Sequence, residues 1–126
     1  AGAITLRLPW MLPAPGQGAV AICCRTGDLQ CLAQAEAINH GPTYQAVTEE
    51  RRFLNRMEAG CTAPVGALCQ PLASGHWQFS AIALKPDGSA SLHETRTCTP
   101  AELPGLGEAV AEALLARGAA ALIHTP

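Results

Sequence analysis

The chain has 126 residues, of which 48% are hydrophobic, 4% aromatic and 14% charged, with a formal net charge of −2. This length predicts one small domain, or one domain with a piece of another attached. The low charge gives no electrostatic basis for binding nucleic acid or a membrane surface. No apolar run reaches the ~18 residues of a spanning helix, and the first seven residues do not resemble a signal peptide. We therefore expect a soluble protein.

The cysteines are expected to be reduced thiols. The sequence has neither a Cys-x-x-Cys motif nor a zinc-like spacing of cysteine and histidine, so no metal site is predicted. The sequence has neither a secretory signal nor a dense cysteine framework, so disulfides are not expected. We therefore expect the protein to be in the cytoplasm. The six residues are Cys23, Cys24, Cys31, Cys61, Cys69 and Cys98.

The first part of the chain predicts a connector and a strand. Residues 12–18, Leu-Pro-Ala-Pro-Gly-Gln-Gly, contain two prolines and two glycines, which favour an extended connector. Residues 19–24 are continuously apolar, which is typical of a strand buried on both faces. Few other segments could pair with this strand. We therefore assign residues 1–28 to preceding domains and expect residues 19–24 to find backbone partners outside their own chain, self-association included.

Two helices are predicted next. Asp28 is a suitable N-cap for a helix from Leu29 to about Ile38. A second helix is predicted from about Thr43 to Glu58. Its apolar arc consists of Ala46, Val47, Phe53, Leu54 and Met57.

Glu50 falls inside the apolar arc of the second helix. A buried carboxylate needs hydrogen-bond donors. We expect Glu50 to accept hydrogen bonds from the backbone of a neighbouring loop and to fix the bend at Cys61.

The remainder predicts a three-stranded antiparallel meander over residues 64–72, 76–84 and 90–98. Thr99-Pro100-Ala101-Glu102 matches a capping box, and a Pro-Gly pair delays the long helix to about Leu106. Gly118 is expected to end that helix. Residues 29–126 thus predict an α+β domain with helices on one face of the sheet.

Cys61 lies between Gly60, which is expected to stop the second helix, and Pro64, which restarts extended chain. This pattern predicts an exposed loop. On the residues alone two interpretations stay open, because most free cysteines are small buried hydrophobes, whereas a thiol on a loop can face a cleft.

Three segments carry a family resemblance. LPAPGQGAVAI (12–22), TEERRFL (48–54) and NRMEAGCTAPVGA (55–67) occur in this order and resemble the C-terminal part of porphobilinogen deaminases (hydroxymethylbilane synthases). The resemblance extends from Leu12 onward and implies that the N-terminal part of the family is absent. It also implies that Cys61, in the loop with Gly60, carries a dipyrromethane cofactor through a thioether. The parent enzyme would join four porphobilinogen units, with loss of ammonia, into hydroxymethylbilane.

The resemblance implies two further cofactor-binding residues. Arg51 matches an arginine that faces the cofactor carboxylates, and Gln17 matches a connector glutamine near the cofactor. Because a helix C-terminus raises the pKa of a nearby thiol, activation of Cys61 would need a cation such as Arg51. The plainer interpretations are a solvated arginine paired with a nearby glutamate and an ordinary loop glutamine.

No residue of this chain is expected to be catalytic, because the family's catalytic aspartate and most of its anion-binding arginines lie in the absent part. The fragment alone is expected to be inactive. One alternative is a non-catalytic α+β interaction domain in which Cys61 is structural. Another is a cysteine-nucleophile hydrolase, for which the sequence places no histidine as base.

Overall fold

The computed structural model describes residues 2–4, 11–60 and 63–124. Within these residues the chain folds into four α-helices, one short 3-10 helix and three β-strands. In chain order they are α1 (Leu29–Ala37), α2 (Gly41–Arg56), β1 (Val65–Pro71), β2 (Trp77–Leu84), β3 (Ser91–Cys98), η1 (Pro100–Glu102), α3 (Leu106–Ala116) and α4 (Ala119–His124). None of the helices in this described part has the length and hydrophobicity needed to cross a membrane.

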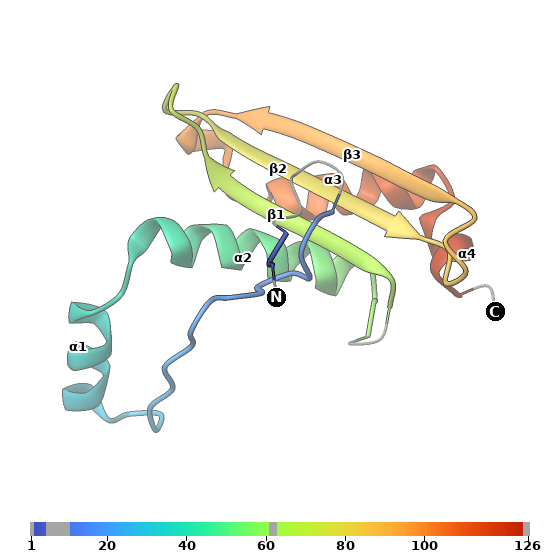
Figure 1. Cartoon of the computed structure of the whole chain (residues 1–126). Coiled ribbons are helices and arrows are strands. Elements are labelled where there is room, and N and C mark those ends of the chain that lie inside the picture. Colours follow the sequence, from blue (N-terminus) through green and yellow to red (C-terminus); the bar gives the residue numbers. More distant parts are fainter. Residues whose placement is uncertain (1, 5–10, 61–62, 125–126) are drawn as a thin grey trace.

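The three strands form one antiparallel sheet in the order β1-β2-β3. Its register pairs Ala67 with Ala81, and Ala81 with Glu94. Helices α2, α3 and α4 lie behind this sheet in Figure 1. The predicted α+β fold, with a three-stranded antiparallel sheet and helices on one face, is confirmed.

The core lies between β2 and the helices. Trp77, Phe79, Ala81 and Ala83 alternate along β2 and are all buried, as their period of two predicts. Phe79 meets Phe53 of α2 with ring centroids 5.7 Å apart and planes tilted by 50°, a favourable arrangement for two aromatic rings. This contact joins the sheet to α2, the helix that carries the candidate site residues.

The segment after β3 follows the predicted capping signals. Thr99 and Glu102 form the capping box around η1, and α3 begins at Leu106 after Gly105, whose φ is +92°. Gly118, with φ +94°, ends that helical path as expected. Helix α4 follows and was not predicted; its six residues are too few for a helical period to show.

Residues 19–24 differ from the predicted buried strand. They are mostly exposed and follow an extended path without strand pairing, and among the described residues their backbone makes one hydrogen bond, from the Ala19 N–H to the Gly16 carbonyl. An apolar run indicates a preference for burial but does not supply a partner. The expectation that such partners come from outside the chain stays a prediction.

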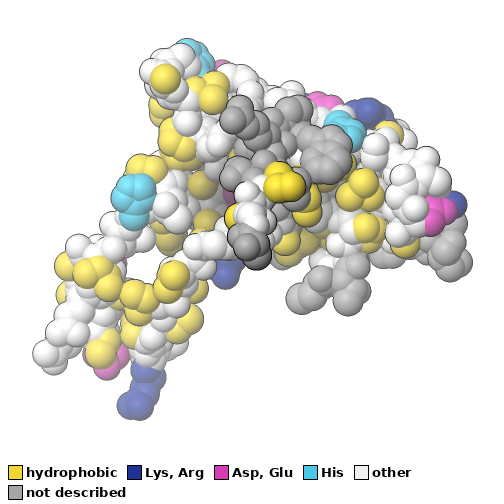
Figure 2. All heavy atoms as spheres, viewed as in Figure 1, with side chains coloured by type: hydrophobic (Ala, Val, Ile, Leu, Met, Phe, Trp, Pro, Cys, Tyr) yellow, Lys and Arg dark blue, Asp and Glu magenta, His cyan; other side chains and the backbone are white. Residues whose placement is uncertain are grey.

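Helix α1 is also separate from the core. Asp28 caps it as predicted, since its carboxylate accepts a hydrogen bond from the Cys31 N–H at 3.0 Å, and this bond lowers the Asp28 pKa. No residue of α1 is buried. Hydrophobic side chains gather over α1 and the extended segment before it, at the lower left of Figure 2. The large exposed ones are Val20, Ile22, Leu29, Leu32 and Ile38.

Candidate functional site

Glu50 of α2 joins the helix to two other parts of the chain. It is 5% exposed. One carboxylate oxygen accepts a hydrogen bond from the Gly16 N–H of the connector at 2.6 Å. The other accepts from the Cys69 N–H of β1 at 2.8 Å. Burial raises the pKa of Glu50, while these two bonds act in the opposite direction.

The sequence predicted that Glu50 is buried and accepts hydrogen bonds from backbone, and both points are confirmed. One donor, Gly16, lies on a loop as predicted, and the other, Cys69, lies on β1. The N–H of Cys69 points away from β2, so a helix side chain can reach it. Glu50 therefore fixes the connector. The expected role of Glu50 in fixing the bend at Cys61 stays a prediction, because Cys61 lies outside the described residues.

The connector lies along the outer edge of β1. The Pro13 carbonyl accepts a hydrogen bond from the Ala67 N–H at 2.9 Å. Gly66 lets the connector approach β1 closely, since a Cβ at Gly66 would lie 3.0 Å from the Leu12 carbonyl oxygen. Together with the Cys69–Glu50 bond, this contact satisfies the outward N–H groups of β1, which an edge strand would otherwise leave open.

Gln17 lies on a tight turn of this connector. The Gln17 N–H donates to the Ala14 carbonyl at 3.0 Å, and the Gln17 side-chain oxygen accepts from the Ala14 N–H at 3.0 Å. A backbone N–H needs an acceptor, which fixes the orientation of the amide. The side-chain NH₂ of Gln17 has no partner within the described part of the chain, so it presents hydrogen-bond donors.

The Arg51 side chain is exposed, and it makes no hydrogen bond or ion pair with residues 2–4, 11–60 and 63–124. Its two neighbouring glutamates are occupied. Glu50 binds backbone, and Glu49 accepts from Arg52 at 2.7 Å. Pairing of Arg51 with a nearby glutamate is therefore not seen. Gln17 and Arg51 directly follow Gly16 and Glu50, the two residues that the connector hydrogen bond joins.

Helix α2 ends at Arg56, four residues before Gly60, so the expected stop at Gly60 was wrong. The Ala59 N–H bonds to the Leu54 carbonyl at 3.4 Å, and the Glu58 N–H to the Asn55 carbonyl at 3.1 Å. This pair of bonds is a Schellman motif. Its left-handed position is held by Glu58, with φ +52°, where glycine is the usual residue.

Cys61 lies outside the described residues, so its predicted exposed loop stays a prediction. Of its flanking residues, Gly60 is exposed, and a Cβ at Gly60 would meet nothing within 4 Å. The Ala63 N–H donates to the Gly60 carbonyl at 3.0 Å. The chain on both sides is thus held together at an open part of the surface.

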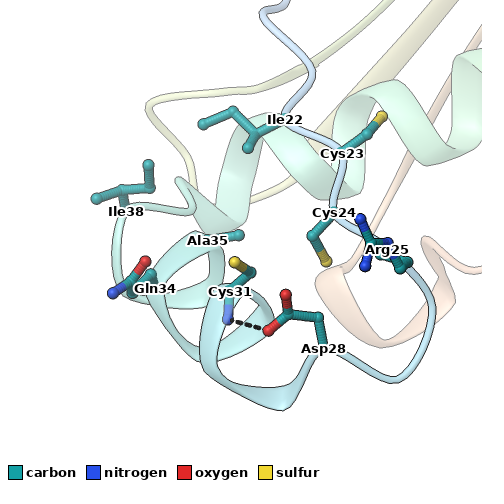
Figure 3. Close-up of a pocket in the computed structure, with 9 residues that line it drawn as sticks. All are labelled: Ile22, Cys23, Cys24, Arg25, Asp28, Cys31, Gln34, Ala35 and Ile38. Atoms are coloured by element: carbon teal, nitrogen blue, oxygen red, sulfur yellow. Dashed lines mark hydrogen bonds between the residues drawn. The ribbon is translucent and has the colours of Figure 1, made fainter.

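The other cysteines are free and fall into two groups. Cys69 and Cys98 are buried, and burial raises the pKa of Cys69 to about 12 and that of Cys98 above its ordinary value. Cys23, Cys24 and Cys31 are exposed. The sulfurs of Cys24 and Cys31 point into an open groove of about 440 Å³ between the extended segment and α1 (Figure 3). In the described part of the chain, no three His, Cys, Asp or Glu side chains are grouped to hold a metal.

Sequence reasoning missed Glu49. It is 3% exposed, and its carboxylate accepts hydrogen bonds from the Gly105 and Gly107 N–H groups at 3.1 and 3.0 Å. This places a negative side chain at the N-terminus of α3, where it is favourable. Adjacent glutamates beside an apolar arc, followed far downstream by Gly-x-Gly at a helix start, are the only signal the sequence offers.

The amino-acid sequence of the chain is similar to that of known proteins of one family. Residues 44–116 match the model of the family described as porphobilinogen deaminase, C-terminal domain. The chain is 40% identical over 117 residues to a porphobilinogen deaminase of Thermobifida fusca, covering 86% of this chain and 37% of the relative. It is 40% identical over 127 residues to that of Mycobacteroides abscessus, covering 94% and 42%. A third relative, from Acidothermus cellulolyticus, is 38% identical over 120 residues, covering 92% and 36%. The chain thus spans about two-fifths of the length of these curated relatives.

Proposed function

Because this chain belongs to the porphobilinogen deaminase family and corresponds to its C-terminal domain, we propose that it is the cofactor-carrying domain of a hydroxymethylbilane synthase. The match over residues 44–116, which includes Cys61, carries this proposal. The complete enzyme joins four porphobilinogen units with loss of ammonia. A dipyrromethane cofactor on Cys61 serves, when bound, as the primer to which these units are added.

The choice of Cys61 rests on chemistry as well as on the motif. A thioether forms through the thiolate. Burial raises the pKa values of Cys69 and Cys98, so these two thiols are poor nucleophiles. The exposed Cys23, Cys24 and Cys31 precede the residues that match the family domain. Cys61 therefore fits the attachment point best.

The donors near the connector fit an anionic cofactor. Arg51 offers a planar guanidinium without a described partner, and the parallel N–H groups of a guanidinium suit bidentate contact with carboxylates. Gln17 presents amide N–H groups, since Ala14 occupies its oxygen. We assign both to binding the acetate and propionate groups. Open space around Gly60 leaves room beside the attachment point.

Porphobilinogen is the proposed substrate of the complete enzyme, and this domain alone is proposed to be inactive. Within the described residues we assign no proton-transfer catalyst. Adding porphobilinogen to the isolated chain should release no ammonia. Turnover by the isolated chain would contradict the proposal.

The sharpest test of the function is the intact mass of the complete enzyme. We expect the wild type to carry an excess of several hundred daltons that is absent in Cys61→Ser. Cys31→Ser, which removes an exposed thiol elsewhere, should keep the excess. A wild type without added mass would favour the alternative of a non-catalytic interaction domain with a structural Cys61.

The apolar surface of residues 20–24 and α1 supports a further part of the proposal. This surface is expected to be covered by another protein surface, because large hydrophobic side chains are exposed on it. They include Val20, Ile22, Leu29 and Leu32. The covering surface is either the rest of the enzyme or a second copy of this chain. Light scattering of the isolated chain should show self-association that Ile22→Asp reduces; a monomer in which residues 19–24 resist hydrogen exchange would contradict this.

We place the enzyme in the cytoplasm, where thiols stay reduced.

A further inference from the structure

We propose that Glu50 is a positioning residue for the cofactor: its carboxylate holds the connector that carries Gln17 in place against α2, which carries Arg51. This inference rests on the proposed function, because it concerns the residues assigned there to the cofactor. Glu50 itself is assigned no contact with the cofactor.

The geometry of the carboxylate supports this role. Its two oxygens bond to two segments that are far apart in sequence, the connector through Gly16 at 2.6 Å and β1 through Cys69 at 2.8 Å. Gly16 also packs on α2, since a Cβ there would lie 3.9 Å from the Val47 side chain. Three segments therefore meet at one buried side chain.

The chemistry of the site requires a carboxylate. Both partners are backbone N–H donors, so both side-chain oxygens must accept. Glutamine has nearly the same shape but replaces one oxygen with an NH₂ donor, which would face one of the two N–H groups. Glu50→Gln thus breaks one bond without creating a cavity, and the connector bond of Gly16 or the strand bond of Cys69 is lost.

The sequence neighbours of the bonded pair explain why this affects the cofactor. Gln17 follows Gly16, and Arg51 follows Glu50. A shift of the connector relative to α2 therefore changes the separation of the two side chains assigned to the cofactor carboxylates. A misplacement of about 1 Å can reduce catalytic efficiency up to about a hundredfold.

Glu49 provides a matched control on the same helix. It is also buried, and it also accepts two backbone N–H bonds, from Gly105 and Gly107. Its backbone partners lie at the N-cap and in the first turn of α3 and not on the connector, and its other oxygen pairs with Arg52. Glu49→Gln therefore removes a comparable buried carboxylate while leaving the Gly16 bond in place.

The experiment uses the complete enzyme as wild type, Glu50→Gln, Glu49→Gln and Gln17→Ala, at a temperature where all are folded. Hydrogen exchange is measured over residues 12–19, cofactor occupancy by intact mass, and kcat and KM with porphobilinogen. We expect Glu50→Gln to exchange faster over residues 12–19 and to lose roughly ten- to a hundredfold in kcat/KM or in cofactor occupancy. Glu49→Gln should match the wild type in these measurements. The double variant Glu50→Gln/Gln17→Ala should lose little more than Gln17→Ala alone.

The outcomes separate this inference from the proposed function. Faster connector exchange with wild-type cofactor occupancy and kinetics would overturn the positioning role and leave the function intact. Equal losses in Glu49→Gln and Glu50→Gln would also overturn it, because the effect would then be general destabilisation. A wild type without cofactor would instead overturn the proposed function. If Glu50→Gln does not fold, Glu50→Asp, which keeps the charge but shortens the reach, is subject to the same criteria.

Discussion

Gly107 of α3 lies directly against the backbone of Glu49 in α2. Its N–H donates to the Glu49 carboxylate at 3.0 Å, and a Cβ at Gly107 would overlap the Glu49 carbonyl group. The two helices thus cross at a point where only hydrogen fits. This contact sets how closely α2 and α3 approach each other.

Gly107→Ala should destabilise the fold. Alanine gains about 1 kcal/mol in helix propensity, but it would push apart two helices at a backbone contact, and overpacking typically costs about 1–3 kcal/mol. Because this Cβ would meet backbone and not a flexible side chain, the cost should lie at the upper end of that range, and we expect a net loss of about 1–2 kcal/mol in a urea melt. Gly41→Ala, where a Cβ meets nothing within 4 Å, is the control and should change stability little. Equal stability of both variants would contradict the close crossing.

Glu50→Ala should lower the free energy of unfolding by about 1–3 kcal/mol, because the Gly16 and Cys69 N–H groups lose their acceptor. A denaturant melt of the two proteins provides the measurement, and equal stability would contradict the expectation.

The free energy of unfolding of the wild type should also depend on pH through the titration of Glu50. Burial raises the folded pKa of Glu50 above its ordinary value of 4.5, so the folded chain binds this proton more tightly than the unfolded chain. The stabilisation that comes from this more tightly bound proton is fully present below pH 4.5, and it is lost as the pH rises through the folded pKa. The stability difference between wild type and Glu50→Gln should therefore shrink from pH 4.5 towards neutrality; a growing difference would show that the pKa is lowered.

Glu58→Gly should stabilise the end of α2. Glu58 adopts φ +52°, a conformation that glycine takes without the Cβ penalty. We expect a gain of about 0.5–1 kcal/mol in a denaturant melt, reduced by the greater freedom of glycine in the unfolded chain. Ala59→Gly, one residue later and without a positive φ, should not gain. A loss of stability in Glu58→Gly would mean that the Glu58 side chain makes a compensating contact.

Thiol alkylation should divide the cysteines by burial. At mildly alkaline pH, iodoacetamide should modify Cys23, Cys24 and Cys31 in the folded chain. Cys69, with a pKa of about 12, and Cys98 should react only after unfolding, because their thiols are sealed and stay protonated. Peptide mass mapping before and after denaturation provides the measurement. Rapid labelling of Cys69 in the folded chain would show that β1 opens easily.

Local patterns were sufficient for most of the fold. The alternation of Trp77, Phe79, Ala81 and Ala83 identified the core face of β2, and the Thr99–Glu102 capping box located η1. Long-range partnerships could not be predicted in this way. The donors that bind Glu49 lie 56 and 58 residues away in sequence, and no periodicity links such positions.

In the candidate site, too, local patterns predicted some features and could not predict the long-range partners. The apolar arc of α2 indicated that Glu50 is buried and needs donors, but not that Gly16 and Cys69 supply them. The resemblance supplied Arg51 and Gln17, and physical reasoning on the sequence did not. Residues 19–24 show the limit most clearly, because composition predicts that a segment should be buried but cannot say which chain buries it.

The contact between Pro13 and Ala67 has a consequence for how firmly the connector is held. Its described contacts with the domain are chiefly two hydrogen bonds, at Pro13 and Gly16, and the approach of Leu12 to Gly66. The Pro13 bond contributes about 1 kcal/mol and the Gly16 bond, whose acceptor is a carboxylate, about 1.5–3 kcal/mol, whereas bringing two separate molecules together costs about 4–15 kcal/mol. The connector therefore stays on β1 because the intervening chain keeps its local concentration high. A single protease cut within residues 19–28 should release residues 12–18 from the isolated chain, with every contact of the folded domain otherwise unchanged.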